Sequence, residues 1–239
     1  MGRISSLLSL GTLDGPGIRY VVFMQGCPLR CACCHNPETH DINGGQEYTA
    51  DEIVEKVVKY KEYFGEDGGI TLSGGEPLLQ AEFATEIFKK AKENGINTCL
   101  DTSGCILNES VKELLKYTDY CMLDIKYSTD ELYQKYVGCG IDTPLEFLRY
   151  LHQNKIPTRI RQVIVPTIND TKADTDALYE LIKDFEIDKV ELLPFKKICQ
   201  TKYDSMGIEF PFGSIPSANA KSTKILQDNI NSKLKEKIL

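Results

Sequence analysis

Three cysteines, Cys27, Cys31 and Cys34, stand in the spacing C-x-x-x-C-x-x-C. Three thiolates this close together can bind three irons of a cubane iron–sulfur cluster and leave the fourth iron without a protein ligand, whereas a cluster that only carries electrons ordinarily has four protein ligands. An iron with open positions can bind a small molecule and pass an electron to it. Gly26 and Pro37 flank the run, which predicts a loop and not a helix.

Zinc is an alternative, because the three cysteines together with His35 would make a three-cysteine, one-histidine set. Structural zinc sites more often use two well-separated ligand pairs, since a tetrahedron is hard to build from one short loop. Structural thiols or disulfides are a second alternative, although the total of nine cysteines is odd and shows no regular pairing. Cys33 lies inside the loop, but its spacing from Cys31 is very tight, so we expect that it is not a ligand. The spacing favours iron–sulfur and leaves the two alternatives open.

Two further runs place polar groups where a ligand could meet them. Gly74-Gly75-Glu76-Pro77 either lets a ligand approach the backbone, with Glu76 facing a cationic group, or is a tight turn into a helix. Asp124 and Lys126 are two residues apart on an expected strand end, so both point to one face. Such a pair suits a zwitterion or a ribose, or is a plain salt bridge.

Oxygen-rich and charged residues elsewhere admit two interpretations each. Asp101 and Thr102 offer oxygen ligands to a cation, or serve the structure alone. The Asp14-Gly15-Pro16-Gly17 run is a turn by composition and can present Asp14 to a peptide. Arg161 either pairs with a core carboxylate or is aimed at a substrate.

Composition limits the class of protein. The chain has 239 residues, enough for one large α/β domain spanning 1–239. Its formal net charge is -7 with no basic stripe, which argues against a nucleic-acid partner. No run approaches the ~18 apolar residues of a membrane span. The first residues lack the apolar core of a signal peptide, and with free cysteines we expect a reducing cytoplasm.

Short β-rich runs alternate with amphipathic helical runs. The expected strands are 19–25, 69–73, 97–101, 120–124, 158–165 and 190–193. The expected helices begin at a capping box at Thr49 and continue with 82–94, 110–115, 130–137, 144–154, 171–184 and 218–236. The Gly, Pro and Ser residues of 202–217 predict a flexible segment.

Six β-then-α units in sequence imply a parallel sheet with right-handed crossovers. Two architectures compete, a doubly wound sheet and an incomplete (β/α)6 barrel, that is, a partial TIM barrel. The residues at or near the C-terminal ends of the expected strands are Cys27, Ser73, Asp101, Asp124, Arg161 and Pro194. One site fed by every strand favours the incomplete barrel.

The motifs together resemble those of the radical S-adenosylmethionine (SAM) enzymes, and within them the activases of glycyl radical enzymes. The matching runs cover nearly the whole chain and are 14–19 (DGPGIR), 26–31 (GCPLRC), 34–36 (CHN), 74–77 (GGEP), 124–126 (DIK) and 192–194 (LLP). The resemblance implies a radical SAM partial barrel in which one [4Fe–4S] cluster, held by Cys27, Cys31 and Cys34, reductively cleaves SAM. Methionine and a 5′-deoxyadenosyl radical result, and the radical takes hydrogen from a glycine of a partner enzyme.

The resemblance also implies roles for individual residues. Contacts with SAM fall to Cys33, Cys34, His35, Gly75, Asp124, Ile125, Lys126 and Lys196. A monovalent-cation site falls to Asp101, Thr102 and Asp124, and the grip on the partner's glycine loop to Asp14, His35 and Arg161. The chain departs from the family at Cys33, where an aromatic residue is usual, and at Phe195-Lys196, where Tyr-His is common.

The choice of partner follows from what the chain lacks. No cysteine lies between His35 and Thr49, so we expect no ferredoxin-like insert. Many activases of other glycyl radical enzymes carry such an insert, so its absence favours pyruvate formate-lyase as the partner. The resemblance also implies flavodoxin or ferredoxin as the electron donor, and we expect a monomeric activase that works under anaerobic conditions. The alternatives are an activase of another glycyl radical enzyme, a radical SAM enzyme acting on a small molecule and, outside enzymes, a zinc-binding interaction module.

Overall fold

The computed structural model describes residues 1–236. One eight-stranded sheet has the order β3-β1-β2-β4-β5-β6-β7-β8. Its strands are β1 (Gly2–Gly11), β2 (Arg19–Met24), β3 (Gln46–Tyr48), β4 (Gly69–Gly74), β5 (Asn97–Thr102), β6 (Tyr120–Asp124), β7 (Thr158–Ile164) and β8 (Lys189–Pro194). Every neighbouring pair from β2 to β8 is parallel, whereas β1 is antiparallel to both β2 and β3.

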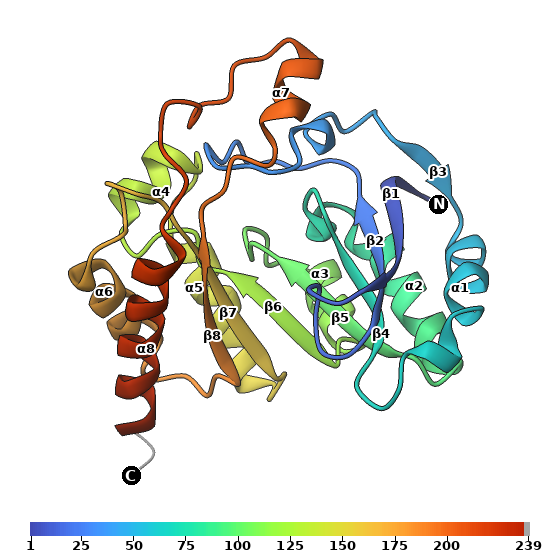
Figure 1. Ribbon diagram of the computed structural model, residues 1–239. Coiled ribbons are helices and arrows are strands. Elements are labelled where there is room, and N and C mark those ends of the chain that lie inside the picture. Colours follow the sequence, from blue (N-terminus) through green and yellow to red (C-terminus); the bar gives the residue numbers. More distant parts are fainter. Residues whose placement is uncertain (237–239) are drawn as a thin grey trace.

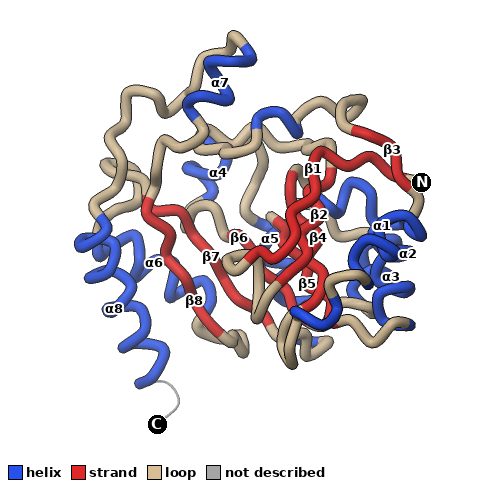
Figure 2. Tube along the Cα trace, turned by 45° about the vertical axis from the view of Figure 1, so that its right-hand side comes forward, coloured by secondary structure: helices blue, strands red, loops and turns tan. Residues whose placement is uncertain are grey.

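The parallel strands follow one another in the sheet in the same order as in the chain (Figure 1). A doubly wound sheet requires a reversal of that order, and right-handed crossovers that all run one way place the helices on one face. Figure 2 accordingly shows the strands as a curved inner wall with helices outside it. The wall is open, because β3 and β8 are its two edges. The prediction of an incomplete barrel is confirmed, and the doubly wound alternative is wrong.

The helices lie close to the predicted ranges, except for α7, which was not predicted. They are α1 (Ala50–Val58), α2 (Ala81–Glu93), α3 (Glu109–Leu115), α4 (Asp130–Tyr136), α5 (Asp142–Gln153), α6 (Lys172–Ile182), α7 (Gln200–Met206) and α8 (Ala220–Glu236). The predicted capping box at Thr49 and Glu52 starts α1. Within residues 1–236, no helix combines the length and apolar character that crossing a membrane needs.

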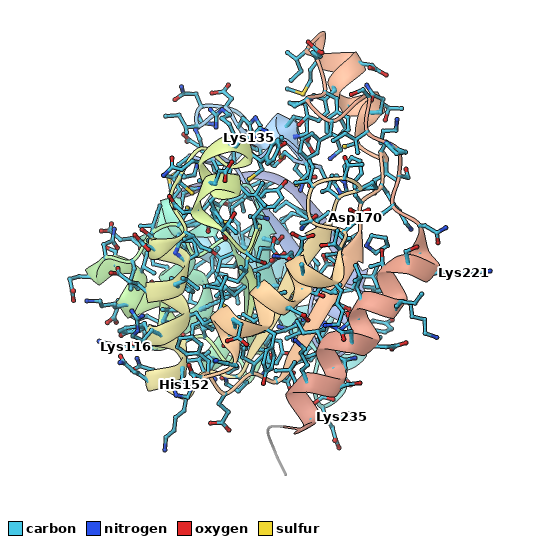
Figure 3. All side chains as sticks on the ribbon, turned by 90° about the vertical axis from the view of Figure 1, so that its left-hand side faces the viewer. Lys116, Lys135, His152, Asp170, Lys221 and Lys235 are labelled. Carbon is cyan, nitrogen blue, oxygen red and sulfur yellow. The ribbon has the colours of Figure 1, made fainter. Side chains whose placement is uncertain are left out.

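Helix α8 covers the outer face of the β8 edge. It packs along β8 and α6 and buries Leu226 and Ile230. Lys221 and Lys235, near its two ends, project away from the sheet into solvent (Figure 3). This one-sided burial is the amphipathic pattern that made the segment recognisable as a helix.

The antiparallel strands β1 and β3 were not predicted. In β1 the buried and half-buried positions alternate only weakly, and Leu8 and Leu10 are exposed. Its run of Ser and Leu lacks the β-branched residues that mark the parallel strands. The strand forms because it completes the hydrogen bonds of β2, which is a tertiary and not a local preference.

The segment after β8 is more ordered than its composition predicts. It contains α7, and it buries Tyr203, Phe210 and Phe212 around Phe195. The Phe195 ring lies 6.2 Å from the Phe210 ring and 5.9 Å from the Phe212 ring, centroid to centroid. Ala32 of the cysteine loop belongs to the same apolar group. The prediction of a flexible 202–217 segment is therefore wrong, since aromatic burial outweighs the glycine and proline content.

We expect Phe195→Ala to lower the free energy of unfolding by about 3–5 kcal/mol, because a fully buried ring leaves a cavity in this aromatic group. Ile198→Ala is the matched control, since Ile198 is 71% exposed, and it should change stability by less than about 0.5 kcal/mol. Urea unfolding of the metal-free protein measures both. Equal effects of the two variants would show that the segment does not fold with the barrel.

Candidate functional site

A cavity of about 340 Å³ opens at the carboxyl ends of the parallel strands. The loop after β2 and the ends of β4, β5, β6 and β7 contribute to its wall, and the β1–β2 connection adds one side chain from below. The predicted site residues that line it are Asp14, Cys27, Cys31, Cys33, Cys34, His35, Gly75, Asp101, Thr102, Asp124, Lys126 and Arg161. Nearly all of the residues singled out from the sequence thus meet in one place.

The cysteine loop is fixed from two sides. On one side, the backbone N–H groups of Arg30 and Ala32 donate to carbonyl oxygens at the end of α4, at 3.2 and 2.8 Å. On the other, the Tyr203 hydroxyl of α7 donates to the Cys34 carbonyl at 3.2 Å. Lys202 of α7 adds an ion pair with Glu38 at 2.5 Å. A loop without regular structure therefore holds its thiols in place through its neighbours.

The three thiols of the cysteine loop all line the cavity. Three thiolates are a donor set that fits a cubane cluster, in which each binds its own iron. The buried Tyr127 hydroxyl lies in the apolar group that also contacts Cys27 and Cys31, and it has no hydrogen-bond partner among residues 1–236. An unpartnered polar atom at this place fits a site that a bound group completes.

Burial controls the ionisation of these thiols. It raises the pKa of Cys27 to about 12 and that of Cys34 to about 11, and it raises the pKa of Cys31. The thiols are therefore neutral at pH 7 unless a metal replaces the proton, since metal ligation requires the thiolate. Cys33 is in the same condition, with burial raising its pKa to about 12.

The paired glycines are required by the protein itself. A Cβ at Gly75 would lie 2.2 Å from the Gly26 carbonyl oxygen, so the turn after β4 can pack against the cysteine loop only as glycine. The Gly75 N–H donates to the Met24 carbonyl at 2.9 Å. That leaves the carbonyl oxygen of Gly75 as the polar group that it can offer to a ligand in the cavity.

Glu76 does not face a cationic group, as one interpretation of the sequence expected. It is 1% exposed, and its carboxylate accepts four hydrogen bonds. The donors are Leu78 N at 3.2 Å, Thr102 Oγ1 at 2.6 Å, Ser103 N at 3.0 Å and Ser103 Oγ at 2.5 Å. Its role is to join the turn after β4 to the turn after β5, which places Gly75 and Thr102 on the same wall.

Opposite charges alternate along the wall formed by β5, β6 and β7. Arg161 bridges two carboxylates, with Nε 2.8 Å from Asp124 Oδ1 and Nη2 bonded to Asp101. Lys126 Nζ lies 2.6 Å from Asp124 Oδ2. Ser73 Oγ donates to the other Asp101 oxygen at 2.7 Å. Arg161 thus shows the pairing with core carboxylates that was the first of its two interpretations, while it still lines the cavity.

The two carboxylates of this wall differ in proton affinity. Burial raises the pKa of Asp101 to about 6, with Arg161 opposing and the Asp124 charge adding to the rise. Burial also works against the charged form of Asp124, but Arg161 and Lys126 outweigh it and lower its pKa. At pH 7 the wall therefore carries two carboxylates and two cations, a balance that suits a zwitterionic ligand.

Of three other residues predicted to contact SAM, one lines the cavity and two do not. His35 lines the cavity, and its Nε2 lies 3.0 Å from the Lys196 carbonyl, so Nε2 carries the proton. The Lys196 side chain itself is exposed and does not line the cavity. Ile125 is fully buried behind the wall, where its carbonyl accepts from Gln162 Nε2 at 3.1 Å. The contacts of Lys196 and Ile125 with SAM remain predictions.

The contacts of two supporting residues were not identified from the sequence, although Ser73 was placed at the end of an expected strand. Ser73 orients Asp101, and Ser103 supplies two of the four bonds to Glu76. Both directly precede or follow a motif at a strand end, where a small hydroxyl residue has no recognisable pattern. Only the distances in the folded chain assign them.

Comparison with known proteins gives a consistent result. The family model of the radical SAM superfamily matches residues 21–182. The pyruvate formate-lyase-activating enzyme of Clostridium pasteurianum is 42% identical over 229 residues, which cover 95% of this chain and 96% of that protein. The pyruvate formate-lyase 1-activating enzyme of Escherichia coli strain K12 is 41% identical over 219 residues, covering 90% and 89%.

Among solved structures, SuiB of Streptococcus suis bound to its precursor peptide SuiA superposes with a TM-score of 0.70 at 15% identity. The match covers 89% of this chain and 46% of SuiB, so this chain spans about half the length of that protein. At so low an identity the likeness concerns the fold alone.

We expect Glu76→Gln to lower the free energy of unfolding by about 1–3 kcal/mol. Each carboxylate oxygen accepts one backbone N–H, from Leu78 and from Ser103, so either orientation of the amide sets its NH2 against a fixed donor. Glu82→Gln is the control, because Glu82 accepts only from Ser110 Oγ, at 3.3 Å. Denaturant unfolding of both variants decides, and a loss no larger than that of the control would contradict the bridging role of Glu76.

Proposed function

This chain belongs to the radical SAM superfamily and, within it, to the family of the pyruvate formate-lyase-activating enzymes, and on that premise we propose that it generates a glycyl radical on pyruvate formate-lyase. One observation supports this most strongly. A single cavity is lined by the three cysteines of the loop, by Asp124 and Lys126 of the charged wall, and by Asp14 of the β1–β2 connection. Cluster, SAM and a peptide could therefore bind next to one another.

When bound, the [4Fe–4S] cluster and SAM supply an electron and, by reductive cleavage, methionine and a 5′-deoxyadenosyl radical that takes a hydrogen atom from the partner's glycine. Cys27, Cys31 and Cys34 would hold the cluster as thiolates, and SAM would bind in the cavity beside it. The hydrogen bonds of the loop to α4 and α7 would keep the three thiols in position for the cluster.

The charged wall orients SAM. Lys126 and Asp124 stand side by side and can meet the carboxylate and the amino group of its methionyl end. The Gly75 carbonyl adds an acceptor for the amino group. Cys33, Cys34 and His35 line the cavity, and the adenine would lie against them. We also propose that Ile125 and Lys196 contact SAM.

A monovalent cation can bind beside SAM at Asp101, Thr102 and Asp124. The bridging guanidinium of Arg161 supports this, because it shows that a positive charge between the two carboxylates is favourable. A cation there would replace the guanidinium. Arg161 would then be available, with Asp14 and His35, to hold the glycine loop of the partner.

We also propose the domain organisation, the oligomeric state, the electron donor and the cellular compartment of the enzyme. We propose one domain over 1–239 without a ferredoxin-like insert, acting as a monomer. Flavodoxin or ferredoxin would supply the electron. A reducing, anaerobic cytoplasm is in keeping with nine cysteines that are all free.

The proposal is tested by anaerobic reconstitution, followed by electron paramagnetic resonance with reduced enzyme, SAM and pyruvate formate-lyase. We expect stoichiometric iron and sulfide and a glycyl radical signal on the partner. Cys31→Ala should lose the cluster, whereas the neighbouring Cys33→Ala should retain iron and sulfide. Normal SAM cleavage without a glycyl radical would point to another glycyl radical enzyme or a small-molecule substrate, and zinc without sulfide would sink the proposal.

The cation site predicts a pH dependence. A proton on Asp101, whose pKa burial raises to about 6, competes with the cation, so affinity should rise with pH through that value and then level off. One competing proton makes the cation bind about fourfold more weakly at about pH 5.5 than at about pH 7.5. Potassium titrations followed through SAM affinity measure it. Asp101→Asn should remove the pH dependence, and equal affinity at both pH values in the unchanged protein would exclude this site.

A further inference from the structure

The β1–β2 connection enters the inside of the barrel below the cavity. In Figure 1 it crosses the inner side of β4 and β5, and hydrogen bonds fix it there. Thr71 Oγ1 of β4 donates to the Asp14 carbonyl at 2.7 Å. Gly17 has φ +65°, and a Cβ there would lie 2.5 Å from Gly68 N, so the connection fits this place only with glycine. The side of the cavity that Asp14 contributes is thus built on the strands.

Arg19 lies beneath this connection as a fully buried cation with neutral partners. Its Nε donates to Thr71 Oγ1 at 3.0 Å. Its other donors meet further oxygens, including Pro16 O at 3.3 Å, Asp67 O at 3.0 Å, Asn97 Oδ1 at 2.9 Å and, on β4 itself, Ile70 O at 2.5 Å. A buried charge is costly unless every donor is satisfied, so this arrangement strongly constrains the segments that supply the oxygens.

The hydroxyl of Thr71 links Arg19 to the backbone of Asp14 through two hydrogen bonds. It has one proton, and the guanidinium of Arg19 can only donate. The hydroxyl therefore accepts from Arg19 and turns its proton to the Asp14 carbonyl. Asp14 itself lines the cavity together with Arg161, and the carboxylate is the polar group of its side chain. The position of that carboxylate thus depends on two residues that do not reach the cavity.

We propose that Arg19 and Thr71 are positioning residues for Asp14: the guanidinium orients the Thr71 hydroxyl, and the hydroxyl fixes the Asp14 carbonyl so that the carboxylate meets the glycine loop of the partner. The inference rests on the proposed function, because it concerns the partner side of the same cavity. It assigns no role to either residue in SAM cleavage.

Three variants separate positioning from stability. Thr71→Val keeps the shape and loses the bond to Asp14, whereas Thr71→Ser keeps the hydroxyl. Asn97→Ala removes another buried bond of Arg19 that does not lead to Asp14. We expect Thr71→Val to raise the KM for pyruvate formate-lyase about tenfold, with SAM cleavage in the absence of partner unchanged. Thr71→Ser and Asn97→Ala should leave that KM within about twofold, although Asn97→Ala should lower thermal stability.

Hydrogen exchange of the amides of residues 12–18 gives a readout that needs neither cluster nor partner. Exchange should be faster in Thr71→Val than in Thr71→Ser or Asn97→Ala. An unchanged KM in Thr71→Val, or the same rise in Asn97→Ala, would overturn the inference. If Thr71→Val does not fold, Thr71→Ala takes its place. If neither Thr71 variant folds and Asn97→Ala does, Thr71 serves the fold alone and the inference is overturned. If the unchanged enzyme forms no glycyl radical, the proposed function fails, and the exchange rates still decide whether Thr71 fixes the connection.

Discussion

Parallel pairing in chain order is the constraint on which the rest of this structure depends. Because each of the strands β2 and β4 to β8 runs the same way, their carboxyl ends meet at one rim, and residues distant in the chain become neighbours. The register of β6 against β7 sets Asp124 opposite Arg161, and that of β5 against β6 sets Asp101 opposite Met122, two residues before Asp124 on the same face. The charged wall is a direct consequence of this register.

Three charged residues differ in the kind of partner that satisfies them. Arg19 and Glu76 are almost completely buried, and neutral groups satisfy both of them. Arg161, in contrast, pairs with carboxylates on the cavity wall. Charges that neutral partners satisfy away from solvent fix loops, since removing any partner leaves a costly orphan. Arg161 is a cation held by two carboxylates beside a cavity, so a cationic ligand could take its place between them.

Sequence reasoning succeeded where a local pattern carries the information. The helices and parallel strands follow apolar periodicity and capping residues, and the site residues follow from motifs at strand ends. It failed for β1, which forms as an antiparallel neighbour of β2, and for the segment after β8, whose order comes from Phe195, Phe210 and Phe212 packing together. It left Glu76 undecided between a ligand contact and a structural turn, because a carboxylate in a motif does not reveal whether a ligand or the protein satisfies it.

The sequence by itself determined the kind of chemistry and the class of fold. The spacing of Cys27, Cys31 and Cys34 depends only on neighbours along the chain, and so does the alternation of strands and helices. Only the tertiary structure decided that the barrel is open and that Glu76 joins two turns. It alone also showed that Arg161 bridges Asp101 and Asp124 and that Arg19 and Thr71 lie under Asp14. The physical reason is that hydrogen bonds and ion pairs between residues far apart in the chain depend on distances that folding alone creates.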